Sequence, residues 1–239
     1  MAFSRRISLT LSLAALCSAL VVGPALVAQA TAKSPTTASV LAATKTALST
    51  ESGVHIMVTT VDNKVSSSVV ADIGTASGTE TYTSGTESFT ITVTPKDAYL
   101  SGTKKGLTTL MGLTSAEQAK VGREAIIMKK GSSPYSTFKE NLTSGSFSKL
   151  LPVAKGTTLL AERDKATNGY RLKWTTVATS TTSKEVSTLT ISSGAKALPI
   201  KESVVTSKGS SHTSFTKWGE LVSVSVPSRT IPYATVFPS

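Results

Sequence analysis

The chain has 239 residues and a formal net charge of +11, because 25 lysine and arginine residues outnumber 14 acidic ones. The basic residues are dispersed and only 5% of the chain is aromatic, whereas nucleic-acid-binding faces combine clustered basic residues with aromatic platforms. We therefore expect a solvated basic surface, compatible with anionic envelope polymers or a membrane surface, and no nucleic-acid partner. Cys17 is the one cysteine, so the sequence offers no disulfide and, beyond this position, no thiolate metal ligand or cysteine nucleophile.

Residues 1–30 have the three parts of a secretory signal peptide. Arg5 and Arg6 precede an apolar run over residues 7–22, and Ala28-Gln29-Ala30 supplies the small side chains that signal peptidase requires. We predict cleavage after Ala30, which leaves residues 31–239 as a single secreted domain long enough to bury a core. Lipidation at Cys17 is the competing interpretation, but Leu16 stands where a small residue normally precedes a lipidated cysteine, so we expect no lipid anchor.

The first half of this domain predicts strands in hairpins after an initial helix. Ser34-Pro35 begins a helix that runs to about residue 50. Apolar and polar side chains then alternate with a period of two, which is typical of half-buried strands. The heptapeptide SGTETYT is followed at once by SGTESFT, and we interpret the two copies as adjacent strands in which Tyr82 and Phe89 are equivalent. The strands expected here cover residues 54–61 and 65–73, the two copies of the repeat up to residue 93, and residues 98–100.

Short helices follow these strands. Leu107, Leu110 and Met111 recur at i, i+3 and i+4, which is one stripe of a helix. Thr114-Ser115-Ala116-Glu117 is a capping box that begins a second helix. Ser133-Pro134 begins a third. A strand at residues 124–129 and a helical piece at residues 147–151 complete this region.

The second half is nearly all strand. Asn168-Gly169 favours a type I′ hairpin turn, and the tail at residues 227–239 holds three prolines, so it cannot continue a central strand. Strands are expected at residues 157–162, 170–174, 185–191, 198–206, 211–215 and 221–226. Tight turns separate most strands and no regular strand–helix alternation occurs, so we predict an α+β fold. It would be one large curved antiparallel sheet of about ten strands, with short helices on its concave face.

Residues that carry chemistry are few. His55 and His212 are the only histidines, both fall in predicted strands or turns, and no G-x-S-x-G elbow is present. The acidic residues, Glu80 among them, are expected mostly in turns and caps, and they form no evident metal-ligand or glycosidase cluster. We therefore predict that the protein is not an enzyme and needs no metal or cofactor. A pH-dependent activity abolished by His55→Ala or His212→Ala would contradict this.

Apolar side chains are then the main candidates for function. One interpretation is an ordinary filled core between sheet and helices. The other is that a strongly curved sheet under loosely packed short helices leaves an apolar pocket, and such pockets take apolar ligands. The candidate lining residues are Ile56, Phe89, Ile91, Val93, Leu107, Leu110, Met111, Phe138, Leu142 and Trp174.

The layout resembles the LolA/LolB-like carriers, and particularly the actinobacterial lipoproteins of the LppX/LprG type. The resemblance is carried by the strand and turn at residues 89–100 with the Leu107 helix, by the strand at residues 170–174, and by the end of the chain. There, Ala197-Leu198-Pro199-Ile200 gives a Leu-Pro strand, Phe215-Thr216-Lys217-Trp218-Gly219 an F-x-x-aromatic-G turn, and residues 222–227 a valine-rich strand ending in proline.

The resemblance implies an open half-barrel whose helices and sheet shelter the acyl chain of a lipid or glycolipid. The expected protein is thus a secreted, monomeric lipid-binding protein of the cell envelope. Its alternative is a non-enzymatic envelope module with a filled core, acting through its basic surface. The family pattern contains no universal ligand-binding residue, so the resemblance assigns none to this chain.

Overall fold

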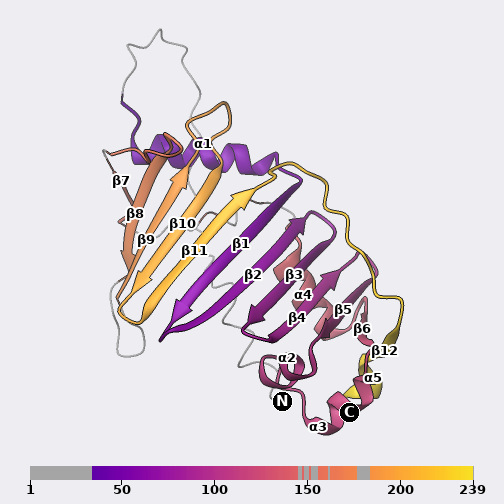
Figure 1. The fold of residues 1–239 in the computed structure, drawn as a ribbon. Coiled ribbons are helices and arrows are strands. Elements are labelled where there is room, and N and C mark those ends of the chain that lie inside the picture. Colours follow the sequence, from indigo (N-terminus) through magenta and orange to yellow (C-terminus); the bar gives the residue numbers. More distant parts are fainter. Residues whose placement is uncertain are drawn as a thin grey trace.

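One sheet of twelve strands runs through the described part of the chain, which comprises residues 34–144, 147, 151, 156–160, 162–176 and 184–238 of this computed structural model (Figure 1). The predicted signal peptide, Cys17 and most of the helical piece at residues 147–151 lie outside the described residues. The strands are β1 (Gly53–Asp62), β2 (Val65–Gly74), β3 (Gly78–Ser84), β4 (Glu87–Val93), β5 (Asp97–Gly102), β6 (Ala125–Lys129), β7 (Thr158–Leu159), β8 (Tyr170–Thr176), β9 (Glu185–Ile191), β10 (Pro199–Thr206), β11 (Gly209–Thr216) and β12 (Thr230–Pro232).

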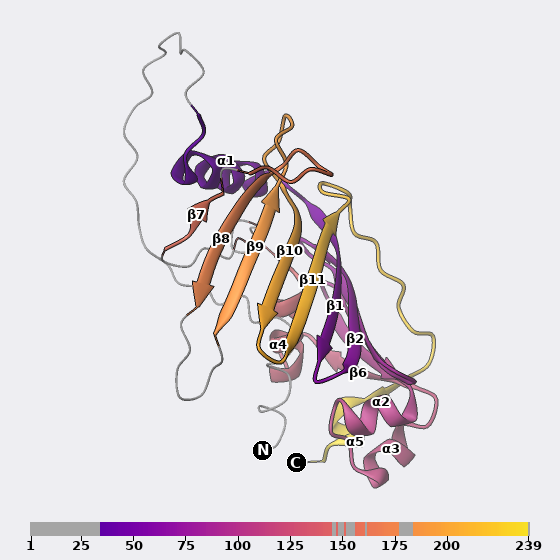
Figure 2. The ribbon, with the colours of Figure 1, turned by 60° about the vertical axis from the view of Figure 1, so that its left-hand side comes forward.

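The strand order is β12-β6-β5-β4-β3-β2-β1-β11-β10-β9-β8-β7. Every neighbouring pair is antiparallel except β12 and β6, which are parallel. The sheet is not closed, since β12 and β7 stand at its two ends, and it twists and curves along its width (Figure 2). The predicted α+β fold with one large, curved, mostly antiparallel sheet is therefore confirmed.

Local sequence explains the hairpins on one side of the sheet. Asn63 and Lys64 both have positive φ, 47° and 68°, which is the type I′ turn that a two-residue hairpin requires. The repeated heptapeptide forms β3 and most of β4, and Tyr82 pairs directly with Phe89. By contrast, at Asn168-Gly169 only Asn168 has positive φ, 52°, so the predicted type I′ turn is wrong there.

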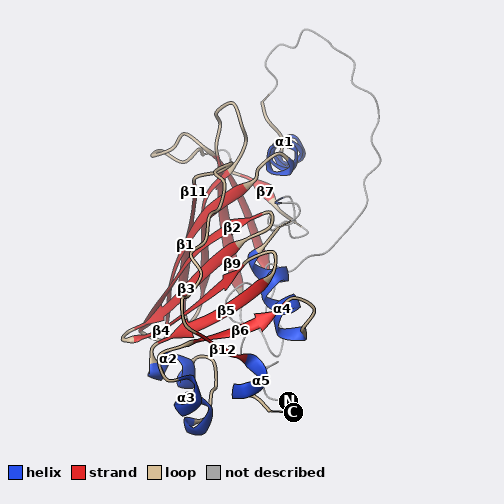
Figure 3. Ribbon diagram, turned by 90° about the vertical axis from the view of Figure 1, so that its right-hand side faces the viewer, coloured by secondary structure: helices blue, strands red, loops and turns tan. Residues whose placement is uncertain are grey.

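Five short helices are seen in the described residues: α1 (Thr37–Ser49), α2 (Lys104–Thr109), α3 (Ser115–Val121), α4 (Ser133–Leu142) and α5 (Tyr233–Val236). α3 has the predicted capping box, with the Thr114 side chain accepting from the Glu117 backbone N–H. α1 and α4 begin slightly away from their predicted starts, because Thr36 caps α1 and Ser132 caps α4. Figure 3 shows α1 and α4 on the same side of the sheet.

The predicted strand at residues 221–226 is wrong. β11 pairs with β1 on one side and with β10 on the other, and β1 is itself paired with β2, so the chain that leaves β11 finds no free edge there. It turns at Gly219, whose N–H donates to the Gly53 carbonyl (2.9 Å), and crosses the ends of the strands as an extended strap. We call residues 217–229 the strap. It ends where the Arg229 carbonyl accepts from Ala125 N–H, beside β6.

Candidate functional site

Strand alternation divides the sheet into an apolar inner face and a polar outer face. The inner face carries rows of side chains that run from strand to strand, and the outer face is rich in threonine and serine, such as the hydroxyl pair Thr81–Thr90 at 2.9 Å. One inner row consists, in sheet order, of Ile126, Leu100, Ile91, Glu80, Ala71, Ile56 and Phe215. All five helices contribute buried apolar side chains on this inner side.

The inner face does not hold one continuous core. One apolar cluster joins β4, β5 and β6 to α2, α3, α4 and α5, and a second joins β1, β2, β8, β9 and β11 to α1 and Phe147. Val69 is buried but belongs to neither cluster. Val58 and Tyr82, its cross-strand neighbours, are only half-buried. We call Val58, Val69, Glu80 and Tyr82, which lie along the boundary between the two clusters, the seam.

Tyr82 of the seam stacks on the ring of Phe89. The rings of Tyr82 and Phe89 lie 5.5 Å apart between centroids, with 16° between their planes. Phe89 is 7% exposed and belongs to the first apolar cluster, and the half-buried Tyr82 packs against that cluster, so the stack joins the seam to it. Offset aromatic pairs of this kind form rigid apolar walls.

The ten candidate lining residues fall into both clusters. Ile56 and Trp174 belong to the second cluster and the other eight to the first. Val93, Leu107, Phe138 and Leu142 are at most 3% exposed, so they are packed inside the first cluster. The candidates that keep more exposed surface are Ile56, Phe89, Ile91 and Trp174, at 6–7%, and the half-buried Leu110 and Met111.

Glu80 and Glu202 stand on the inner face in the middle of their strands, away from the strand ends. Glu80 lies between Ala71 and Ile91, and Glu202 lies between Leu189 and Thr213. Burial raises the pKa of Glu80. Burial first, and then repulsion from Glu185, raises the pKa of Glu202 to about 7. Glu80 lies in a predicted strand, so it is an exception to the expectation that the acids fall mostly in turns and caps.

A sequence signal for Glu80 was present. Glu80 precedes Tyr82 by two positions, as Glu87 precedes Phe89, so the period of two places both acids on the aromatic face of their strands. Glu87 is at the open end of its strand and forms an ion pair with Lys105 at 2.7 Å. Glu80 lies deeper, which the repeat alone does not indicate.

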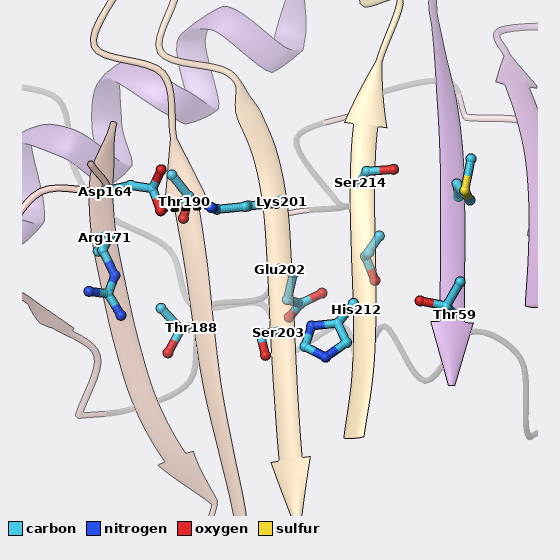
Figure 4. Close-up of a pocket in the computed structure, with 12 residues that line it drawn as sticks. Thr59, Asp164, Arg171, Thr188, Thr190, Lys201, Glu202, Ser203, His212 and Ser214 are labelled. Carbon is cyan, nitrogen blue, oxygen red and sulfur yellow. Dashed lines mark ion pairs between the residues drawn. The ribbon is translucent and has the colours of Figure 1, made fainter. Parts of the chain in front are cut away.

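The outer face carries a polar hollow of about 510 Å³ across β1, β11, β10, β9 and β8 (Figure 4). Its lining includes Met57, Thr188, Thr190 and His212. Asp164 and Lys201 point toward each other with 2.7 Å between Oδ2 and Nζ. Hydrogen bonds from Lys201 and Thr167 hold the pKa of Asp164 down, at about 2.

His55, one of the two histidines, pairs with an acidic side chain. His55 Nδ1 lies 2.7 Å from Asp72 Oδ1, joining neighbouring strands on the outer face. Within the residues that the structure describes, no group of three His, Cys, Asp or Glu side chains could hold a metal ion. In the same residues, no helix combines the length and apolarity needed to cross a bilayer.

Comparison with known proteins finds similar solved structures, whereas no family model and no curated protein matches the chain. The crystal structure of LprF from Mycobacterium bovis matches with 14% identity and a TM-score of 0.48, over 79% of this chain and 95% of that one. The Mycobacterium tuberculosis lipoprotein LppX matches with 17% identity and a TM-score of 0.40, over 79% and 100%. A DUF1329 family protein from Desulfovibrio piger matches with 9% identity and a TM-score of 0.28, over 78% and 92%.

The names LprF and LppX agree with the resemblance found in the sequence.

Proposed function

We propose that the protein is a secreted, non-enzymatic carrier that shelters the acyl chain of a lipid or glycolipid between the inner face of the sheet and the helices. The chain would lie along the seam, between the two apolar clusters. Of the ten candidate residues, Ile56, Phe89, Ile91, Leu110, Met111 and Trp174 would contact it. Val93, Leu107, Phe138 and Leu142 would instead support the wall from behind.

The observation that carries this proposal is the division of the inner face. A sheet that served only as one side of a core would bury its apolar rows under a single cluster. Here Val58 and Tyr82 stay half-buried between the clusters, beside the buried Val69. An acyl chain laid on these side chains would remove their apolar surface from water, at roughly 25 cal/mol per Å².

Two further features agree with a carrier outside the cytoplasm. The first thirty residues read as a cleavable secretory signal that removes Arg5 and Arg6 and no acid, so the mature chain would keep a net charge of +9 (23 − 14), which would favour approach to an anionic membrane surface. The sheet is also open at both ends in the described residues, so a ligand need not pass through a closed wall.

The proposal is tested by blocking the seam. Val58→Trp places a large ring on the inner face at a half-buried position, and Met57→Trp places the same ring on the outer face of the same strand, where Met57 is 45% exposed. We expect the mature wild-type protein to bind a fluorescent C16 fatty-acyl probe. Val58→Trp should weaken binding at least tenfold, and Met57→Trp should leave it within twofold.

Both variants are checked by circular dichroism for an unchanged fold before binding is measured. A wild-type protein that takes up no acyl probe and carries no lipid in native mass spectrometry contradicts the proposal. So does a Val58→Trp variant that folds and binds as well as the wild type.

The alternative is an envelope module that acts through its surface, and the outer hollow favours it. Arg171 and His212 stand there among threonine and serine hydroxyls, while Lys201 is paired with Asp164, and this lining suits a polymer with many hydroxyl groups and a few anionic ones. Binding to such a polymer that weakens with salt, in a protein that takes up no lipid, would favour this function over the carrier.

A further inference from the structure

Glu80 is an acid in an apolar row. Its cross-strand neighbours are Ala71 on β2 and Ile91 on β4, and the row continues to Ile56 on one side and Leu100 on the other. All four neighbours in the row are buried, and Glu80 itself is 5% exposed. A leucine or valine would fit the pattern of this row better than an acid does.

The carboxyl group of Glu80 has no hydrogen-bond or ion-pair partner among the residues that the structure describes. Glu51, the other buried acid of this part of the chain, shows the usual arrangement, with Lys196 Nζ 2.7 Å from its Oε1. A buried acid without a partner is costly, so its presence calls for a functional explanation, such as a bound molecule that pairs with it. In the described residues, every fully buried side-chain oxygen has a hydrogen-bond partner. The oxygens of Glu80 have none, so they are not fully buried and a ligand can reach them.

Glu80 lies on the seam, where its carboxyl group can hydrogen-bond a ligand bound there. Ala71 belongs to the second apolar cluster and Ile91 to the first, so Glu80 stands on the boundary between them. A ligand that lies along the seam passes over this side chain. Its polar atoms, if placed there, would meet the one acid of an otherwise apolar row.

We propose that Glu80 is the polar recognition group of the seam and hydrogen-bonds an uncharged hydroxyl or ester group of the bound lipid. The inference rests on the proposed function, because it requires the acyl chain to lie on the inner face. Burial raises the pKa of Glu80, which favours the neutral acid. A neutral carboxylic acid both donates and accepts, so it can pair with a hydroxyl or an ester carbonyl.

The chemistry of the site selects among lipids. A monoacylglycerol offers both groups next to its acyl chain without a charge. A fatty-acid anion would have to lose its hydration and lie beside an acid, which is unfavourable in an apolar space. A pure hydrocarbon would leave the Glu80 carboxyl without a partner.

The test compares three probes with an eighteen-carbon chain and one double bond, namely 1-monooleoylglycerol, oleate and 1-octadecene. Each is added from mixed micelles to displace one fluorescent acyl reporter from the protein. The variants are Glu80→Leu, which removes the hydrogen-bonding group, and Glu80→Gln, which keeps it. Asp72→Leu is the matched control, because it removes an acid from the outer face of the neighbouring strand. A buried acid without a partner costs free energy, and leucine at this position removes that cost and matches the apolar row, so Glu80→Leu should fold.

We expect the wild type to bind 1-monooleoylglycerol at least tenfold more tightly than 1-octadecene and oleate. Glu80→Leu should reduce the preference over 1-octadecene to within twofold while 1-octadecene binds at least as well as before. Glu80→Gln should keep most of the preference, and Asp72→Leu should keep all of it.

The outcomes separate this inference from the function beneath it. If the wild type binds all three probes equally, or if Glu80→Leu keeps the full preference, the role of Glu80 is overturned while the carrier function stands. If none of the probes displaces the reporter and the wild type takes up no acyl chain, the carrier function itself is overturned.

Discussion

At the scale of single residues, Glu202 makes the folding stability of the protein depend on pH. Burial and the nearby Glu185 raise the pKa of Glu202 from 4.5 to about 7, so the folded protein holds this proton more tightly than the unfolded chain does. The folded state therefore binds more protons between these values, and its stability falls as the pH rises from about 4.5 to about 7.

Glu202→Gln should remove this dependence. We expect the variant to be more stable than the wild type at pH 8, by up to about 3 kcal/mol, and nearly equal to it at pH 4. Urea unfolding at both pH values measures the difference. An equal gain in stability at pH 4 and pH 8, or none at pH 8, would show that Glu202 does not titrate in this way.

Single residues also show which features of the structure could be predicted from the sequence. The period of two correctly placed Ile56, Phe89 and Ile91 on the buried side of their strands, because alternation is a local property of the backbone. Depth is not local. Whether Glu80 is at a rim or in the middle of the face depends on which strands flank β3 in the complete sheet and on what packs against them, which the repeat alone does not indicate.

At the scale of elements, the capping box, the hairpin turns and the repeat predicted helices and strands well, since each depends on neighbours a few residues away. The strap was mistaken for a strand because its valines alternate as a strand's would. Val222 and Val224 are half-buried while Leu221 and Ser223 are exposed, so the alternation is real. Only the missing free edge next to β11, a property of the whole sheet, keeps the strap out of the ladder.

The strap closes on Gly53, and this contact makes an element-scale prediction. A Cβ at Gly53 would lie 2.1 Å from the Glu220 carbonyl oxygen, a backbone atom that cannot move alone. Gly53→Ala should therefore displace the strap and destabilise the protein by about 1–3 kcal/mol. Thermal or urea unfolding measures this loss.

Gly194→Ala is the matched control, because the only atom its Cβ would approach, at 3.2 Å, is the hydroxyl oxygen of Ser192, a side-chain atom that can rotate. It should change stability by less than about 0.5 kcal/mol. A Gly53→Ala variant as stable as the control would mean that the strap is not held against β1 as described.

At the scale of the whole molecule, twelve strands form one sheet whose two halves are built differently. One half consists of hairpins made from successive strands, β1 to β5, and these could be predicted from the sequence. The halves are joined by β1 and β11, in which Ile56 pairs with Phe215 across most of the chain length. No local pattern indicates that pairing, so the boundary between the two clusters, and with it the seam, could not be predicted.

The division of the inner face gives the molecule its proposed function. Packed side chains such as Leu107 and Leu142 hold one cluster together, and Leu48 and Leu172 hold the other. The boundary between them is lined by residues that are buried less completely or that lack a partner. A carrier needs this combination, since the walls must stay folded when the ligand leaves.

The most direct measurement is to map where a bound acyl chain lies. A C16 fatty-acyl probe with a diazirine at mid-chain would be bound to the mature protein, photolysed, and its attachment sites identified by peptide mass spectrometry. The carrier function predicts labelling at the inner-face residues Val58, Val69, Tyr82 and Phe89. Labelling confined to outer-face residues such as Met57 and Val70, or no specific labelling, would contradict it.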